Sequence, residues 1–277
     1  MKGGCDGANG DQREAALELW QVLILAVVQG LTEFLPVSSS GHLVIGAACL
    51  GIDAETLDVA EVTIALHVGT LLAILMFYAR RIVRILTTDR RLIGLLVWGT
   101  LPAVVVGVPI ELWFEELLES PAIAGAMLLV TGGLLLGLRR LTVGDGADHE
   151  ATRSDSVWIG VFQAAAVLPG LSRSGSTIYA GIWRGLSPKD AATFSFLLAV
   201  PAIAGAAVLK VASMMAKGTS PQTAWPVLAA GIAVSFVVGL AALAWLVRWV
   251  EQGRIWWFAA WCFPLGVAVL LWSAMWS

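Results

Sequence analysis

Six apolar runs constrain this chain more than any other feature, because each is close to the roughly 20 residues that a helix needs to cross a bilayer. They cover residues 60–79, 92–110, 122–138, 193–213, 225–247 and 255–276. Hydrophobic residues make up 58% of the 277 residues and charged residues only 13%, which is too apolar for a water-soluble globule. The sequence therefore predicts an all-α, polytopic membrane protein with about six full transmembrane helices.

Two further segments, 19–50 and 157–186, are apolar at both ends but interrupted in the middle by Pro, Gly and Ser. Backbone that is not helical at membrane depth leaves polar groups without partners, so it must be buried in protein or line a polar cavity. We expect each segment to form a re-entrant or broken helical hairpin. The two interruptions mark the predicted functional site.

Lys and Arg residues gather in the loops on one side of the predicted spans. They are Arg80, Arg81, Arg84, Arg90, Arg91, Arg139, Arg140, Arg153, Arg184, Lys189, Arg248 and Arg254. The other side would hold Lys2, Arg13, Lys210 and Lys217. Because basic loops stay in the cytoplasm, we expect a multi-pass protein of the plasma (inner) membrane, in contact with its lipids, with the mouth of the first hairpin facing outward. The net charge of −3 offers no basic field for a nucleic-acid partner.

The chain also carries a weak internal repeat. Shifting it by 134 positions places 29–41 over 163–175, and one Gln, two Ser and one Gly coincide. Each copy precedes three spans, and a hairpin plus an odd number of spans makes the two halves antiparallel, which is the inverted-repeat plan of many transporters. We expect a polar tail over 1–18, a first repeat over 19–140, a polar linker over 141–156 and a second repeat over 157–277, all in one membrane domain.

The first interruption combines a helix end with a helix start. Gln29 and Glu33 lie four residues apart and share a helix face, and Pro36 ends that helix near Leu35. Residues 38–41, Ser-Ser-Ser-Gly, then open the helix that carries His42. Backbone N–H groups and hydroxyls at a helix start favour an anion. A His next to such a turn and to a carboxylate suits general acid–base or nucleophilic chemistry.

The second interruption repeats these features and adds a fixed positive charge. Pro169 and Gly170 break the chain, and residues 172–177, Ser-Arg-Ser-Gly-Ser-Thr, open the next helix. Arg173 provides the planar fork that suits phosphate. Two such turns meeting in one site predict a ligand with two anionic groups, such as a diphosphate.

Other interpretations of these residues stay open. Small residues in membrane helices commonly serve close packing, which is the alternative for Ser40, Gly175 and Ser176. Glu33 and Arg173 have the alternative of simply pairing with each other, although ionisable groups at membrane depth are usually functional. The two histidines outside the motif, His67 and His149, are predicted to pack or bond within the bundle and to be solvated, respectively.

The segments QGLTEFLPVSSSGH (29–42) and LPGLSRSGST (168–177) closely resemble the two signature segments of the undecaprenyl-diphosphatase family of the bacitracin-resistance type. The resemblance covers essentially all of residues 19–276. It implies hydrolysis of undecaprenyl diphosphate to undecaprenyl phosphate and inorganic phosphate, at a site that opens to the outer face and uses a divalent cation. That reaction recycles the lipid carrier for cell-wall glycan synthesis.

Carried over by position, the resemblance implies four catalytic residues. Glu33 matches the essential acidic residue, Ser39 the proposed nucleophile, His42 the catalytic histidine and Arg173 the phosphate-binding arginine. The expected substrate-binding residues are Gln29, Ser38, Ser40, Ser172, Ser174 and Thr177. Family members often have Glu where this chain has Gln29, so the expected Mg or Ca site at Glu33 lacks a second carboxylate and is weakened.

Some of the same sequence features suggest two other functions, a lipid carrier and a different type of membrane phosphatase. A transporter or flippase of polyprenyl phosphate would share the inverted repeat, but it has little need of Ser39 and His42 as reactive groups. A second type of membrane phosphatase carries P-S-G-H and S-R-x5-H motifs, and it is excluded because no His follows Arg173 at that distance. The sequence leaves the oligomeric state open, a homo-oligomer included.

Overall fold

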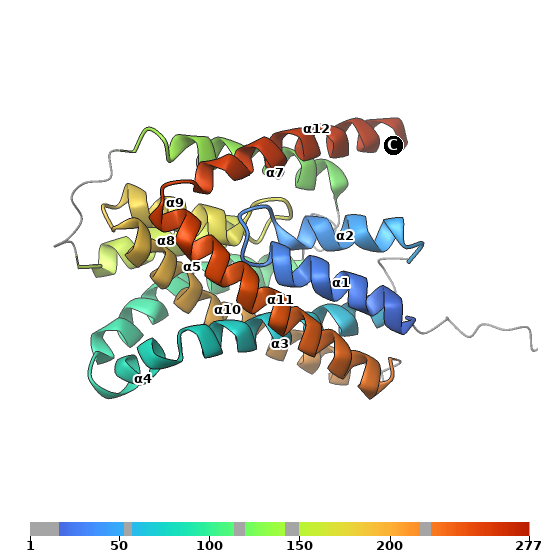
Figure 1. Cartoon of the computed structure of the whole chain (residues 1–277), viewed down its shortest axis with the longest axis horizontal. Coiled ribbons are helices and arrows are strands. Elements are labelled where there is room, and N and C mark those ends of the chain that lie inside the picture. The colour runs from blue at the N-terminus through green and yellow to red at the C-terminus, as the bar shows by residue number, and fades with distance from the viewer. Residues whose placement is uncertain (1–16, 53–56, 114–119, 142–149, 217–222, 277) are drawn as a thin grey trace, which may run out of the picture.

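The computed structural model describes residues 17–52, 57–113, 120–141, 150–216 and 223–276. Every regular element in these ranges is helical (Figure 1). In chain order the elements are α1 (Leu19–Thr32), α2 (Ser39–Cys49), α3 (Leu57–Phe77), α4 (Ala79–Thr87), α5 (Arg90–Trp113), α7 (Pro121–Gly137), α8 (Arg153–Ala165), α9 (Arg173–Trp183), α10 (Pro188–Ala216), α11 (Trp225–Glu251), η1 (Ile255–Phe258) and α12 (Ala259–Trp276). Residues 1–16 of the predicted tail, 142–149 of the predicted linker with His149, and Lys217 lie outside the described residues.

The structure describes a polytopic membrane protein, with fewer full-length spans than the six that the sequence predicts. Four elements are long and apolar enough to cross a membrane: α5, α10, α11 and the run of η1 and α12. α3 and α4 together form a fifth candidate that is bent by 70°. α7 has 17 residues and spans about 26 Å, less than the ~30 Å hydrocarbon core. It is short because Pro121 and the Ser120 cap fix its start.

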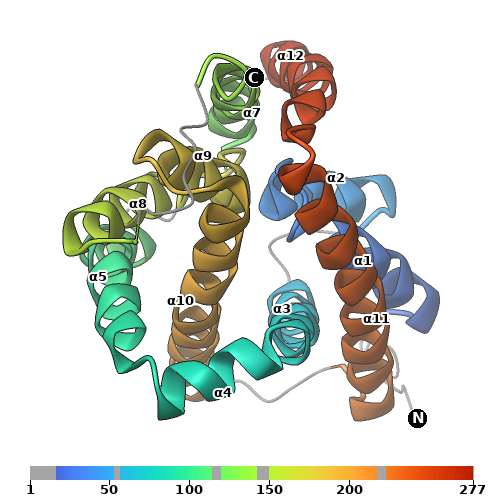
Figure 2. The ribbon, with the colours of Figure 1, turned by 60° about the vertical axis from the view of Figure 1, so that its left-hand side comes forward.

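Helices far apart in the sequence pack in pairs. α1 packs against α11, α8 against α5, and α7 against α12; the last pair lies side by side at one edge of the bundle in Figure 2. The α5–α8 crossing is especially close, because a Cβ added to Gly160 would lie 2.3 Å from the carbonyl oxygen of Gly99. Such small-residue contacts let helix backbones approach where no hydrophobic force drives association.

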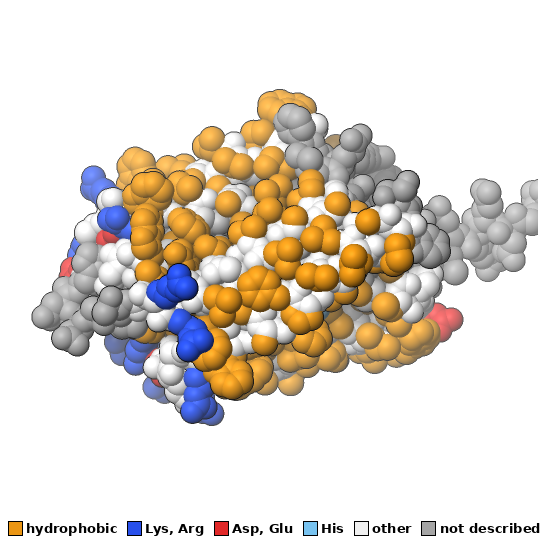
Figure 3. Space-filling model, turned by 90° about the horizontal axis from the view of Figure 1, so that it is seen from above, with side chains coloured by type: hydrophobic (Ala, Val, Ile, Leu, Met, Phe, Trp, Pro, Cys, Tyr) orange, Lys and Arg blue, Asp and Glu red, His pale blue; other side chains and the backbone are white. Residues whose placement is uncertain are grey.

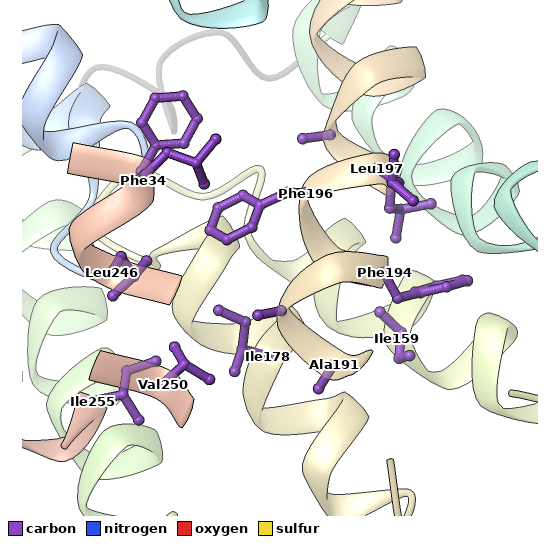
Figure 4. Close-up of a cluster of buried hydrophobic side chains, with 14 of the residues drawn as sticks. Phe34, Ile159, Ile178, Ala191, Phe194, Phe196, Leu197, Leu246, Val250 and Ile255 are labelled. Atoms are coloured by element: carbon purple, nitrogen blue, oxygen red, sulfur yellow. The ribbon is translucent and has the colours of Figure 1, made fainter. Parts of the chain in front are cut away.

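A buried aromatic pair ties the first interruption to the centre of the bundle. Phe34, which directly follows Glu33, is fully buried, and its ring meets that of Phe196 on α10 edge to face at a centroid distance of 5.8 Å (Figure 4). Such a pair contributes about 0.5–1.5 kcal/mol beyond its buried area. The packing of Phe34 therefore holds the chain, and with it the Glu33 carboxylate, in one place.

The outer surface is the kind that faces lipid. Apolar side chains are spread along the length of the face in Figure 3, and Lys and Arg side chains gather at one end. Large side chains such as Val105 and Val208 are exposed on helix faces that no other described element covers. Since a soluble protein rarely exposes apolar surface on this scale, the exposed faces of α5 and α10 are lipid-facing.

Candidate active site

Both predicted interruptions are present. After α1 ends at Thr32, one more helical turn follows, in which the Leu35 N–H donates to the Leu31 carbonyl at 3.2 Å. The backbone leaves the helical path at Pro36. α2 then begins at Ser39. In the second copy, residues 166–172 separate α8 from α9, and Ser172 caps α9 by accepting a hydrogen bond from the Gly175 N–H at 3.1 Å.

The two interruptions touch each other. The Gly170 N–H donates to the Ser38 hydroxyl at 3.1 Å, and the Ser174 hydroxyl donates to the Leu35 carbonyl at 3.4 Å. Ser38 shares a further hydrogen bond with the exposed Ser40 at 3.3 Å, and it is the one non-glycine residue of the described chain with positive φ, at 69°. Segments 132 residues apart thus form one junction.

Gly170 is required at this junction. Its φ is +86°, and an added Cβ would lie 2.0 Å from the carbonyl oxygen of Ala124. Its own carbonyl accepts a hydrogen bond from Thr131 at 2.9 Å. Gly170→Ala should therefore destabilise the fold by about 3 kcal/mol or more, measured as a lower midpoint of thermal unfolding in detergent. Gly133→Ala on α7 is the matched control, because its Cβ would meet nothing within 4 Å; equal midpoints for both variants would contradict this account.

A buried carboxylate stands at the centre of the junction. Glu33 is 8% exposed, and its Oε1 accepts a hydrogen bond from Arg173 Nη2 at 2.7 Å. Its Oε2 accepts from the Ser39 hydroxyl at 2.8 Å and from Gln29 Nε2 at 3.2 Å, and it lies 3.6 Å from His67 Nε2. The structure thus brings three of the four predicted catalytic residues into direct contact.

Two polar atoms beside this carboxylate have no partner. Arg173 Nη1 and Gln29 Oε1 are both buried and make no hydrogen bond within the described part of the chain. Buried polar groups in native proteins are nearly always satisfied. The alternative in which Glu33 and Arg173 merely pair is therefore incomplete: the pair exists, but a donor and an acceptor next to it are left for a ligand.

His42, the fourth predicted catalytic residue, is held differently. Its Nδ1 lies 2.8 Å from the Ser38 carbonyl, so Nδ1 must carry a proton, because a carbonyl oxygen can only accept. Its Nε2 accepts a hydrogen bond from Trp261 Nε1 on α12 at 3.0 Å. No hydrogen bond among the described residues joins His42 to Ser39 or Glu33. His42 must part from the half-exposed Trp261 before its Nε2 can accept another proton.

The remaining predicted substrate-binding residues make internal contacts. The hydroxyls of Ser172 and Ser174 share a hydrogen bond at 3.2 Å. Thr177 is fully buried and shares a hydrogen bond with Ser195 on α10 at 2.6 Å. Ser172, Ser174 and Thr177 thus help to hold the start of α9 in place. Their contact with a substrate stays a prediction.

Three residues beside the junction were not predicted from the sequence to belong to the site: His67, Trp261 and Thr131. His67 was predicted to pack or bond within the bundle, and its Nδ1 does contact the Thr63 carbonyl at 2.7 Å; the neighbouring Glu33 was not foreseen. The rule that ionisable groups inside membranes are functional could have drawn attention to His67. Nothing in the local sequence distinguishes Trp261 from the other twelve Trp residues of the chain.

A metal site made by protein side chains alone is not present in the described residues, which contain no group of three or more His, Cys, Asp or Glu able to hold an ion. The side-chain carboxylate and amide oxygens next to each other at the junction are those of Glu33 and the unpartnered Gln29 Oε1. Mg²⁺ and Ca²⁺ take six or more oxygen ligands. The two residues therefore fit a divalent cation only together with the oxygens of a bound diphosphate.

Comparison with known proteins gives one consistent result. The family described as "Bacitracin resistance protein BacA" matches residues 22–268. An undecaprenyl-diphosphatase of Rhodopirellula baltica is 52% identical over 254 residues, covering 92% of this chain and 98% of the relative. Undecaprenyl-diphosphatases of Desulfatibacillum aliphaticivorans and Desulfosudis oleivorans are 39% and 40% identical, covering 91% and 94% of this chain and 97% and 100% of the relatives.

Proposed function

This chain belongs to the bacitracin resistance protein BacA family, and from that premise we propose that it is an undecaprenyl-diphosphatase of the membrane. Water adds to the terminal phosphorus of undecaprenyl diphosphate, the bridging P–O bond breaks, and undecaprenyl phosphate and inorganic phosphate leave. The product is the lipid carrier for cell-wall glycan synthesis. Keeping that carrier in the monophosphate form is the route by which such an enzyme would confer resistance to bacitracin.

One observation carries the proposal: Arg173 presents a buried, unpartnered Nη1 while its Nη2 is held by Glu33. An arginine anchored at one nitrogen has a fixed orientation, and its remaining donors suit a phosphate oxygen. The starts of α2 and α9 meet at the same junction, and helix starts favour anions. A diphosphate would present one anionic group to each.

The chemistry follows from the hydrogen bonds of Glu33. The Ser39 hydroxyl already donates to Glu33 Oε2, so Glu33 is placed to take a proton from Ser39 or from a water that replaces it. Attack by Ser39 would form a phosphoserine that water then hydrolyses; attack by water would release phosphate directly. In both routes Arg173 stabilises the charge on the transferring phosphoryl group. His42, once released from Trp261, would serve as the second proton-transfer group.

A divalent cation, Mg²⁺ or Ca²⁺, belongs to the proposal as a ligand shared between protein and substrate. Glu33 and Gln29 would hold it, together with the diphosphate oxygens. When bound, it would neutralise negative charge on the diphosphate. Because Gln29 is uncharged, we expect weaker binding than a pair of carboxylates would give, so the cation should be removable by a chelator.

We also propose the finer topology. Residues 19–140 and 157–277 would form two inverted repeats, each with a hairpin, α1–α2 or α8–α9, followed by three spans. The packing of α1 against α11 and of α8 against α5 supports this, because each hairpin contacts the corresponding helix of the other half. The basic end would face the cytoplasm and the first hairpin would open outward, placing the active site on the outer side of the plasma membrane.

The test is phosphate release from a C55 prenyl diphosphate by the full chain in detergent. We expect turnover by the wild type, and a loss of roughly 10²-fold or more in Ser39→Ala and in His42→Ala. A chelator should lower the wild-type rate, and added Mg²⁺ or Ca²⁺ should restore it. If the folded wild type released no phosphate but still bound prenyl phosphate, the result would instead favour a carrier of that lipid.

A further inference from the structure

A second polar site lies between the starts of α5 and α8, and none of its residues belongs to the junction around Glu33. A cavity of about 440 Å³ is lined by Arg90, Arg91, Gly94, Leu95, Trp98, Thr152 and Arg153. An adjoining shallow cavity of about 290 Å³, open to the surface, is lined by Trp98, Arg153, Ser154, Val157 and Trp158. The first cavity is basic and the second is largely aromatic and apolar. Together the two cavities would fit a ligand that has one charged part and one apolar part.

The positive charge in the basic cavity is only partly compensated. Arg91 Nη1 is paired with the carboxylate of Glu150, and its Nη2 donates to the Ala151 carbonyl at 2.9 Å. Arg90 and Arg153 are exposed and form no ion pair within the described residues. Two guanidinium groups thus remain available to an anion.

The position of these arginines in their helices also favours an anion. Arg90 and Arg91 are the first residues of α5, and Arg153 is the first residue of α8. The start of a helix carries partial positive charge, so cationic side chains are disfavoured there and anions are favoured. The first turn of α8 already contains a carboxylate, Asp155, whereas the first turn of α5 contains no acidic residue. An anion in the cavity would therefore be attracted mainly by the start of α5 and would offset its repulsion of Arg90 and Arg91.

The neighbouring helix places this cavity at the level of lipid headgroups. α4 bends by 70° from α3 and combines Arg80 and Arg84 with the exposed apolar side chains of Val83 and Leu86. A short helix with these two faces lies in the plane of the membrane interface. Figure 3 shows the basic side chains gathered at one end of the molecule.

The Trp side chains of the second cavity also indicate a position at the level of the lipid headgroups. Trp98 and Trp158 are 45% and 43% exposed, and Trp side chains favour the membrane–water interface. A ligand that entered between the two cavities would therefore have its charged part among arginines and its apolar part against indole rings that face lipid.

We propose that the paired cavities bind an anionic phospholipid from the leaflet at the basic end. Its phosphate would lie between Arg90 and Arg153, and its glycerol and first acyl carbons would lie against Trp98 and Trp158. Basic pockets between transmembrane helices are typical sites for anionic headgroups. The proposal concerns a binding site separate from the proposed diphosphatase site and does not depend on it.

The experiment titrates the full chain, purified in an uncharged detergent, with short-chain phosphatidylglycerol, and measures binding by calorimetry. We expect saturable binding by the wild type, about 30-fold weaker binding by Arg90→Gln/Arg153→Gln, and near-normal binding by Arg90→Lys/Arg153→Lys. The matched control is Arg140→Gln/Arg254→Gln, which removes two exposed arginines that do not line the cavities. Circular dichroism and the thermal midpoint of each variant report on its fold.

Three results would overturn the proposal. If the control variant lost as much affinity for phosphatidylglycerol as Arg90→Gln/Arg153→Gln, the total positive charge of the surface would be what attracts the lipid. Equal binding of short-chain phosphatidylcholine would mean that the negative charge is not recognised. Inorganic phosphate that bound as tightly as the lipid would assign the cavity to free phosphate.

Discussion

Replacing Arg173 with alanine should lower the turnover of undecaprenyl diphosphate by roughly 10³- to 10⁵-fold, the range known for arginines that stabilise a transferring phosphoryl group. The variant would lose the donor that lies unpartnered next to Glu33, and with it the proposed contact to the phosphate. Phosphate release at saturating substrate measures the effect. A folded Arg173→Ala variant with the wild-type rate would remove this residue from the proposed active site.

Two variants give this result its controls. Arg173→Lys keeps a positive charge beside Glu33 but loses the planar fork, so it should keep most of the stability and still lose activity. Arg254→Ala removes an exposed arginine far along the chain from either interruption and should leave turnover unchanged. If the Lys variant were fully active, charge alone would suffice and the fork geometry would be unimportant.

Replacing Glu33 with glutamine should affect both activity and stability. We expect a roughly 10²- to 10⁴-fold lower rate, because the amide cannot take the proton that Ser39 now donates to Glu33 Oε2. We also expect a loss of about 3–5 kcal/mol of stability, because the substitution leaves the Arg173 guanidinium buried without its counter-charge. Phosphate release and thermal unfolding in detergent measure the two effects separately.

The double variant Glu33→Gln/Arg173→Gln separates the two roles of the pair. With neither charge present, stability should recover well above that of Glu33→Gln, since coupled residues in contact are not additive. Activity should stay absent, because both the proton acceptor and the phosphate donor are missing. A double variant as unstable as the sum of its single variants would show that the 2.7 Å contact contributes little to the fold.

Local sequence features predicted the two interruptions well. Pro36 and the Pro169–Gly170 pair predicted breaks in the helical backbone, because proline lacks an N–H and glycine permits a positive φ; Gly170 does adopt φ +86°. Proline alone is a weaker signal, since Pro102, Pro109, Pro201 and Pro264 lie inside helices. The contact between Gln29 and Glu33 also followed from the sequence, since residues four apart share a helix face. These features depend on near neighbours along the chain.

The number of full spans was predicted less well than the positions of the helices. The apolar run over 122–138 was expected to cross the membrane, and α7 (Pro121–Gly137) matches its bounds to within one residue, but 17 residues are short of a full span. α3 is continued by α4 only after a 70° bend. Hydropathy locates an apolar helix and does not report where the chain bends, because the bend depends on the packing of neighbouring helices.

The sequence by itself determined that the protein lies in a membrane, that two polar turns interrupt its apolar segments, and that Glu33 and Arg173 are the charges to explain. Only the tertiary structure decided that these two groups meet, across 140 positions of the chain, and that His67 and Trp261 stand beside Glu33 and His42. The physical reason is the range of the forces. Propensity and hydropathy act over one or two helical turns, whereas these contacts require separate helices to pack in a single arrangement.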